Sequence, residues 1–180
     1  MKKIIVHTLL IGILLNGCGS QSYFAFNEEI PKNSKFTKID KYVALLEIEV
    51  PDYLKQDRIA VMKNGKIIFL DQKWTEPIEG SLEKELTSYL INRLPSYGVL
   101  KYPWQRDIKA QAEISLHIND FIYKNGKVFL QGYYIIKKED SSYKKIFSLQ
   151  TESSRDPFEI VKNMKKLYKK LEEEIKRDLL

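Results

Sequence analysis

The sequence predicts an α+β protein in which an antiparallel sheet carries two helices packed on one face. Three observations support this prediction. Apolar residues alternate with polar ones in several segments, Asn-Gly pairs separate apolar runs, and two segments repeat apolar residues every three or four positions. Their order is strands, a helix, three antiparallel strands and a second helix, which is typical of a single α+β domain.

The first residues have the three parts of an export signal. Lys2 and Lys3 precede an apolar run over residues 4–15, and small residues surround Cys18. The run is shorter than the roughly 20 apolar residues of a membrane-spanning helix, and no later stretch approaches that length. We therefore predict a cleaved lipoprotein signal peptide over residues 1–17. An uncleaved anchor is the alternative, which the short run disfavours.

The sole cysteine, Cys18, follows Leu15, Asn16 and Gly17 in a pattern similar to the lipobox of bacterial lipoproteins. Asn16 departs from that pattern, since a small or β-branched residue is usual there. A cysteine at the end of an apolar run suits thioether lipidation, while the alternative is a buried free thiol. We expect Cys18 to be the site of lipid attachment, with palmitate among the acyl chains. With no second cysteine, we expect no intramolecular disulfide.

Length and composition fit one globular domain behind a tether. The chain has 180 residues, of which 43% are hydrophobic and 30% charged. We expect a lipidated tether with a short strand over residues 18–41 and an α+β domain over residues 42–180. Loss of Lys2 and Lys3 lowers the formal net charge from +6 to +4. This mild charge favours anionic lipid headgroups or an acidic partner and is too diffuse to indicate nucleic acid.

The first half of the domain predicts a strand, a hairpin and a helix. A short aromatic strand is expected in the tether, apolar residues alternate from Tyr42 to Val50 until Pro51, and Asn64-Gly65 predicts a type I′ turn. The first helix should begin near Ile78 and end at Pro95 and Gly98. The aromatic strand residues are Tyr23, Phe24 and Phe26, the hairpin apolar residues are Ile59, Val61 and Ile67 to Leu70, and the apolar helix residues are Ile78, Leu82, Leu86, Tyr89, Leu90 and Leu94.

The second half predicts a three-stranded meander and a final helix. Residues alternate from Ala110 to Ile118, Asn125-Gly126 supplies a turn, and further strands run over residues 128–136 and 143–150. Asp156 should cap the final helix, with Pro157 in its first turn. Its apolar stripe favours packing on the sheet over a helix-in-groove partner, and comprises Val161, Met164, Leu167, Tyr168, Leu171 and Ile175.

Residues that could carry chemistry are few. His117 is expected on the wet face of a strand beside Glu113 and Ser115, where a solvated histidine is favoured over a ligand or a base. The chain has no glycine-rich phosphate loop, and no metal-ligand or nucleophile–base pattern is readable. The run Glu172 to Glu174 lies among lysines and is expected on a solvated helix face. We expect no catalytic residues, no metal and no cofactor.

Several segments together resemble the PqiC-type ABC transport auxiliary lipoproteins, the partners of paraquat-inducible, Mce-type lipid transport systems. The resemblance covers nearly the whole chain, and the order of its short motifs carries it. At the position where the family usually has tryptophan, this sequence has Tyr133 or Tyr134. Besides the lipobox, the matching residues are Tyr23, Phe24, Val50 to Leu54, Ile59, Trp74, Glu76, Pro77, Ile78, Leu94, Pro95, Val99, Pro103, Trp104, Phe121, Gly126, Lys127, Val128 and Gly132.

The resemblance implies a non-enzymatic periplasmic subunit of an Mce/ABC-type intermembrane lipid transport system. It would bind a PqiB-like, membrane-spanning Mce-domain protein. Gly19 provides no acidic inner-membrane retention signal, which favours the periplasmic face of the outer membrane. Exposed sheet edges would also permit self-association into a homo-oligomer. The residues expected nearest the partner are Pro51, Asp52, Tyr53, Trp74 and Pro77.

Two other classes of function remain as alternatives at this stage. The first is a structural or assembly lipoprotein of an outer-membrane machine, which would share the anchor and the fold. The second is a periplasmic hydrolase, which would need a cleft with perturbed titratable groups. Co-purified partners would separate the first alternative from a transport role.

Overall fold

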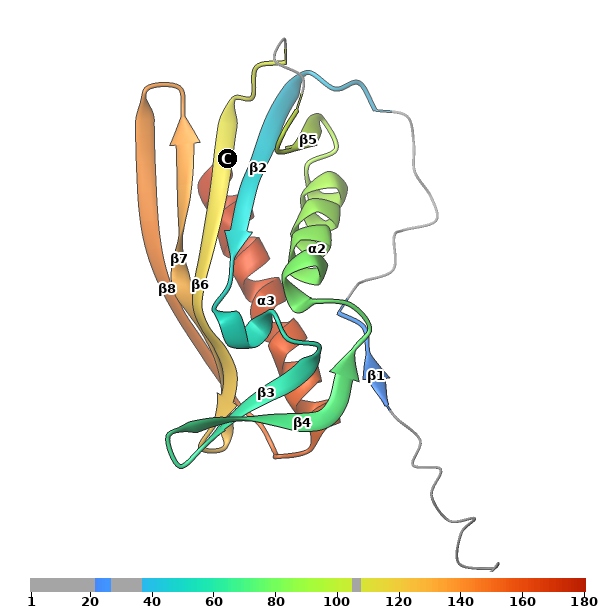
Figure 1. Ribbon diagram of the computed structural model, residues 1–180. Coiled ribbons are helices and arrows are strands. Elements are labelled where there is room, and N and C mark those ends of the chain that lie inside the picture. The colour runs from blue at the N-terminus through green and yellow to red at the C-terminus, as the bar shows by residue number, and fades with distance from the viewer. Residues whose placement is uncertain (1–21, 27–36, 105–107) are drawn as a thin grey trace, which may run out of the picture.

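The computed structural model describes residues 22–26, 37–104 and 108–180. In these residues eight strands form one open, mixed and mostly antiparallel sheet, and two long helices cover one of its faces (Figure 1). The α+β fold class predicted from the sequence is confirmed. The elements are β1 (Tyr23–Phe24), β2 (Lys41–Glu49), η1 (Asp52–Leu54), β3 (Arg58–Lys63), β4 (Lys66–Trp74), α2 (Ile78–Arg93), β5 (Tyr97–Lys101), β6 (Ala112–Lys124), β7 (Lys127–Lys138), β8 (Ser141–Glu152) and α3 (Pro157–Leu179).

Strand pairing combines local hairpins with parallel contacts between them. Strands β3 and β4 pair antiparallel, as do β6, β7 and β8 in the predicted meander. Strand β2 lies parallel to β6 on one side and to β5 on the other, and β3 is also parallel to β6. Because β7 occupies one edge of β6, β2 and β3 share its other edge, one after the other.

Both predicted Asn-Gly turns are present. Asn64 and Gly65 have φ angles of 51° and 73°, and Asn125 and Gly126 have φ angles of 50° and 79°. Left-handed backbone at both central residues is the requirement of a type I′ turn, and its twist matches the twist of the flanking strands. These two dipeptides therefore determine where the β3–β4 and β6–β7 hairpins reverse.

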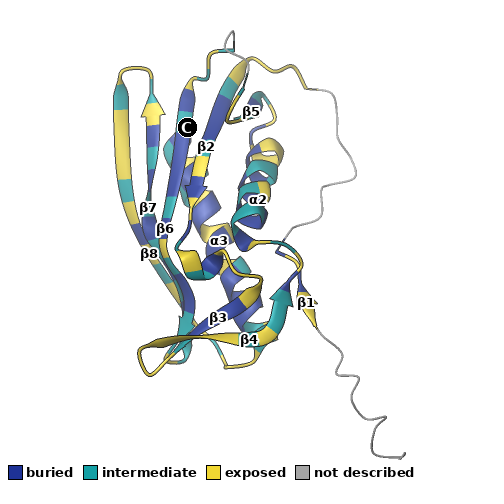
Figure 2. Ribbon diagram, viewed as in Figure 1, coloured by how far each residue is buried: buried dark blue, intermediate teal, exposed yellow. Residues whose placement is uncertain are grey.

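The helices are held to the sheet by the predicted apolar stripes. Every apolar residue that the sequence assigned to the two stripes is buried. A side-chain oxygen of Asp156 accepts a hydrogen bond from the Glu159 amide at 3.1 Å, so α3 begins at the expected cap. The Tyr168 hydroxyl donates to the Leu82 carbonyl at 2.8 Å and joins α3 to α2. Figure 2 shows buried residues along the helices and exposed residues along much of β8.

The structure corrects three details of the sequence analysis. Gly98, expected only to end the first helix, lies in the unpredicted edge strand β5. The expected polar loop over residues 139–142 is a tight turn at Glu139 and Asp140, and the next two serines already belong to β8. Glu172, expected on a solvated helix face, is buried at 2% exposure, where its charge acts on Tyr168 of α3 and on Tyr89 of α2.

The expected signal peptide and Cys18 lie outside the described residues. In the described ranges, no helix combines the length and the apolar character that a membrane span requires.

Candidate functional site

The N-terminal segment nearest the expected anchor is fixed to the domain. Strand β1 pairs in parallel with the end of β4, aligning Phe24 with Trp74, and the Thr75 amide donates to the Phe24 carbonyl at 2.9 Å. The Phe24 ring packs edge-on against Phe158, with 4.9 Å between ring centroids. Phe26 enters the core, where its ring meets those of three aromatic residues: Trp74, Phe121 and Tyr168. The expected short strand is therefore part of the core.

The loop after β2 supports the sheet at the gap between β2 and β3. The Tyr53 hydroxyl accepts a hydrogen bond from the Phe121 amide at 2.9 Å and donates to Asp120 at 2.7 Å. Strand β2 pairs with β6 as far as His117, and β3 pairs with it again from Tyr123. Tyr53 thus satisfies a backbone amide that neither strand reaches. Burial raises the pKa of the Tyr53 phenol well above its usual value, despite the opposing hydrogen bond from Phe121.

The five residues expected near a partner differ in what they can offer to one. Trp74 is only 5% exposed, whereas Asp52 and Pro77 are exposed and Pro51 is half-buried. The structure brings their two segments together through Asp57, whose carbonyl accepts a hydrogen bond from the Trp74 amide at 2.8 Å. The Asp57 carboxylate also pairs with Lys73 at 2.9 Å, and this hydrogen bond holds the pKa of Asp57 below its usual value.

The sheet face opposite the helices carries a row of polar and aromatic contacts. The His117 Nδ1 atom lies 2.8 Å from a Glu49 carboxylate oxygen, and its ring stacks on Tyr133 with 4.5 Å between centroids. The Lys144 ammonium lies 3.8 Å from the centroid of the Tyr133 ring. The neighbouring Ile146, which aligns with Tyr133 on β8, is 77% exposed. Sequence analysis placed His117 on this face but did not find Glu49, because that contact joins different strands.

The two tyrosines at the family's usual tryptophan position have different roles. Tyr133 lies on the open sheet face, whereas Tyr134 is buried and donates a hydrogen bond to Asp178 at the end of α3. Lys145 also donates to Asp178, at 2.8 Å. Burial and the Asp178 hydrogen bond raise the pKa of Tyr134 to about 12. Burial opposes ionisation of Asp178, but the hydrogen bonds from Lys145 and Tyr134 outweigh it and lower its pKa. This cluster attaches the last turn of α3 to β7 and β8.

The β3–β4 hairpin exposes three consecutive apolar residues, which the sequence analysis had assigned only to an apolar run. Ile67, Ile68 and Phe69 are exposed, although they belong to a regular strand. Consecutive strand residues point to opposite faces, so both faces of the hairpin present apolar side chains to solvent. The signal in the sequence was the run itself, since three adjacent strand residues cannot all face one core.

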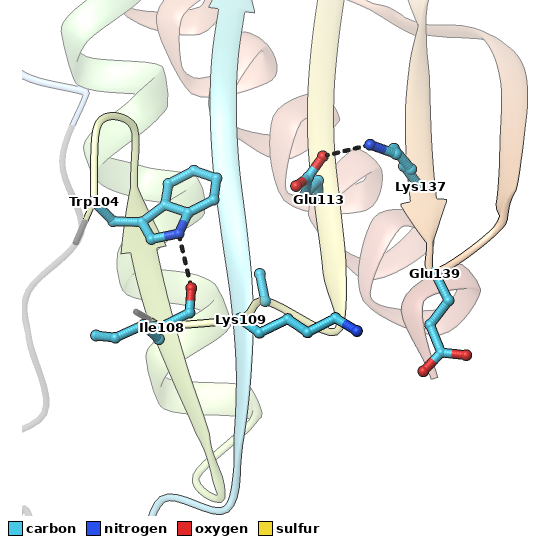
Figure 3. A pocket seen from close by; sticks show the side chains of 7 residues that line it. Trp104, Ile108, Lys109, Glu113, Lys137 and Glu139 are labelled. Carbon is cyan, nitrogen blue, oxygen red and sulfur yellow. Dashed lines mark hydrogen bonds and ion pairs between the residues drawn. The ribbon is translucent and has the colours of Figure 1, made fainter. Parts of the chain in front are cut away.

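Figure 3 shows a shallow pocket at the opposite end of the sheet, with a volume of about 490 Å³. The Trp104 indole donates to the Ile108 carbonyl at 3.1 Å on one side, and Glu113 faces Lys137 at 3.5 Å on the other (Figure 3). A more apolar hollow of about 690 Å³ lies between β2, β5 and the end of α2. In the described part of the chain, no three His, Cys, Asp or Glu side chains are grouped so as to hold a metal ion.

Comparison with known proteins identifies the family. The family of ABC-type transport auxiliary lipoprotein components matches residues 26–176, from the buried Phe26 to the last turns of α3. The chain belongs to this family. No curated protein matches the sequence.

Solved structures share this fold. A crystal structure described only as that of an uncharacterized protein superposes with a TM-score of 0.73 at 19% identity, covering 90% of this chain and 100% of the other. The protein XCC0632 from Xanthomonas campestris, assigned to the family DUF330, superposes with a TM-score of 0.66 at 10% identity, covering 86% of this chain and 92% of the other. At these identities the likeness concerns the fold.

Family membership gives the chain a general role. It is an auxiliary lipoprotein of ABC-type transport, which implies a partnership with transport components and an anchored location in the cell envelope. The aromatic β1 and the loops at η1 and Trp74 all lie within or beside the matched region.

Proposed function

We propose that this protein is a non-enzymatic periplasmic subunit of an Mce/ABC-type intermembrane lipid transport system, close to the PqiC-type members of its family. It is anchored through Cys18 on the periplasmic face of the outer membrane and binds a PqiB-like Mce-domain protein. The family match over residues 26–176 carries this proposal. Gly19 favours the outer membrane because it supplies no acidic retention signal after Cys18.

The position of β1 supports the proposal that the lipid anchor holds the domain close to the membrane surface. Three residues lie between Cys18 and Ser22, and the Ser22 carbonyl already accepts a hydrogen bond from the Lys73 amide at 3.2 Å. The four residue steps from Cys18 to Ser22 span at most about 14 Å when fully extended. A lipid on Cys18 would therefore hold the folded domain against the membrane surface, with little freedom to reach a distant partner.

The loop cluster of Pro51, Asp52, Tyr53, Trp74 and Pro77 remains our proposed partner surface. Asp52 and Pro77 would make the direct contacts, because their side chains are exposed. Tyr53 and Trp74 would act indirectly, by fixing their loops. Tyr53 fixes its loop by hydrogen bonds to β6, and Trp74 fixes its loop by packing on Phe26. The fixed loops would reduce the entropy lost on binding.

A crosslinking pull-down of the full-length lipoprotein from native envelopes tests this function. We expect mass spectrometry to recover an Mce-domain protein, with a large loss in Cys18→Ala. Ser20→Ala, which keeps the lipobox cysteine, is the matched control and should recover the partner normally. Recovery of outer-membrane assembly factors alone would contradict the transport role and favour the structural alternative.

A further inference from the structure

The β3–β4 hairpin has the composition of a surface that contacts lipid. Besides the exposed Ile67, Ile68 and Phe69, the segment from Arg58 to Trp74 contains four basic residues and one acidic residue, for a formal net charge of +3. Apolar side chains flanked by lysines are suited to an anionic membrane surface, where the lysines meet phosphates and the apolar groups enter the interface.

The two lysines at the hairpin tip are placed unfavourably for an isolated protein. Lys63 and Lys66 are directly opposite each other in the register of β3 and β4, on either side of the Asn64-Gly65 turn. Like charges in such cross-strand pairs destabilise a hairpin. Both side chains are exposed, and neither forms an ion pair with a described residue. A layer of phosphate groups would neutralise this repulsion.

Strand β4 of the hairpin also pairs with β1. Along β4, Phe69 is four residues from Lys73, which pairs with Tyr23, and this corresponds to about 13 Å. The chain between Ser22 and Cys18 spans at most about 14 Å. Figure 1 shows the hairpin and β1 at the same end of the molecule, opposite the end of α2. A lipid on Cys18 would thus bring Phe69, the nearest of the exposed apolar residues of β4, to the bilayer.

We propose that the β3–β4 hairpin is a second membrane contact, which rests Ile67, Ile68 and Phe69 in the interface of a bilayer containing anionic phospholipid. This inference builds on the lipid anchor of the proposed function. The anchor holds one point of the domain at the membrane, and the hairpin supplies a second. Two contacts set the orientation of the domain and hence the direction in which the partner loops face.

The test uses the lipidated protein, in which Cys18 is blocked by its lipid. Ile68→Cys then provides the only free thiol for an environment-sensitive dye, and Ile91→Cys provides a matched control. Ile68 and Ile91 are similarly exposed, at 42% and 52%, but Ile91 lies about 20 Å along α2 from its start near Trp74. Both variants are reconstituted into phosphatidylethanolamine vesicles with and without phosphatidylglycerol. Lipids brominated in the acyl chain serve as quenchers.

We expect the dye at position 68 to be quenched several times more strongly than the dye at position 91, and only with phosphatidylglycerol present. Equal quenching at the two positions would overturn the proposal. A dye at position 68 that is shielded from water but not quenched by brominated lipid would also overturn it, since a protein would then cover the hairpin. Lys63→Gln with Lys66→Gln should reduce quenching at position 68 to the level at position 91.

A failure of lipid attachment at Cys18 is measured separately from a failure of the hairpin contact. The mass of the N-terminal peptide shows whether Cys18 carries lipid, which tests the proposed function. The mature chain over residues 18–180, carrying Cys18→Ser and Ile68→Cys and mixed with the same vesicles, then tests the hairpin without the signal or the lipid. We expect the two lysine substitutions to lower its affinity for phosphatidylglycerol vesicles by about 30-fold. An unchanged affinity would contradict the proposed contact.

Discussion

The Tyr53 hydroxyl joins the loop after β2 to the middle of β6 through two hydrogen bonds. Tyr53→Phe removes both and leaves the Phe121 amide without its acceptor. We expect a loss of about 1–3 kcal/mol in the free energy of unfolding, because an unsatisfied buried amide is costly. Urea denaturation followed by circular dichroism measures it. Tyr143→Phe, at an exposed tyrosine on β8, is the control and should change little. Equal midpoints for the two variants would show that the hydrogen bonds are dispensable.

Asp178 should make stability depend on pH. Its pKa is lowered in the folded protein, so its charged form adds stability above the unfolded-state pKa of about 3.9, and that contribution disappears as the pH falls through the folded-state value. We expect Asp178→Asn to lose about 1 kcal/mol at pH 7, through weaker hydrogen bonds to Lys145 and Tyr134.

The difference in unfolding free energy between the wild type and Asp178→Asn should narrow as the pH is lowered from 5 towards 3. Asp140→Asn, in the exposed turn between β7 and β8, is the matched control and should leave stability unchanged at pH 7. A difference for Asp178→Asn that stays constant over the acidic range would contradict the role of its charge.

Single residues could be predicted from sequence only where their neighbours are local. The Asp156 cap and both Asn-Gly turns act within a few residues, and all three were found. Tyr53 was singled out by family resemblance, but its partners are 67 and 68 residues away in sequence. The pairing of His117 with Glu49 is equally distant, so neither contact has a periodic signal.

The β6–β7 pair depends on a glycine at its irregular point. The register shifts between Ile118 and Asp120, and a Cβ atom on the facing Gly132 would lie 2.0 Å from the His117 carbonyl oxygen. Gly132→Ala must therefore push the two strands apart, and we expect a loss of about 3 kcal/mol or more in unfolding free energy. Thermal and urea denaturation measure this loss.

Gly80→Ala in α2 is the matched control for Gly132→Ala. Nothing lies within 4 Å of its Cβ position, so the same substitution should stabilise the protein by about 0.8 kcal/mol through helix propensity. If Gly132→Ala and Gly80→Ala were equally stable, the close approach of β6 to β7 could not explain why position 132 requires glycine.

Elements with strong local patterns were predicted well, as were their antiparallel hairpin pairings, but the parallel pairings were not. The helices and meander strands have clear periodicity, and the structure shows them near the expected bounds, except that β6 continues to Lys124. Strand β5 has only five residues, follows Pro95 and lies at a sheet edge, so its pattern is weak. The parallel contacts of β2 with β5 and β6 join segments far apart in sequence, and alternation within a strand cannot specify them.

The N-terminal segment stabilises the whole domain through Phe26. Its side chain is 2% exposed among core aromatic residues, so Phe26→Ala should cost about 3–5 kcal/mol. The same variant should release β1 from the end of β4, and limited proteolysis should then cut at Tyr23 and Phe24 faster. Tyr23→Ala, at an exposed residue of β1, should change stability little. Unchanged proteolysis in Phe26→Ala would argue against the role of Phe26 in fixing β1 to the domain.

At the scale of the whole molecule, the fixed strand β1 and the exposed Asp52 and Pro77 support our proposal of a domain that is held at a membrane to meet a partner. The most direct measurement is photo-crosslinking in living cells, with a photoreactive amino acid at Asp52 or Pro77 and a control at Lys166 on the exposed side of α3. Our account predicts an adduct with an Mce-domain protein from the two loop positions and none from the control. Adducts with other envelope proteins alone, or equal labelling from all three positions, would contradict it.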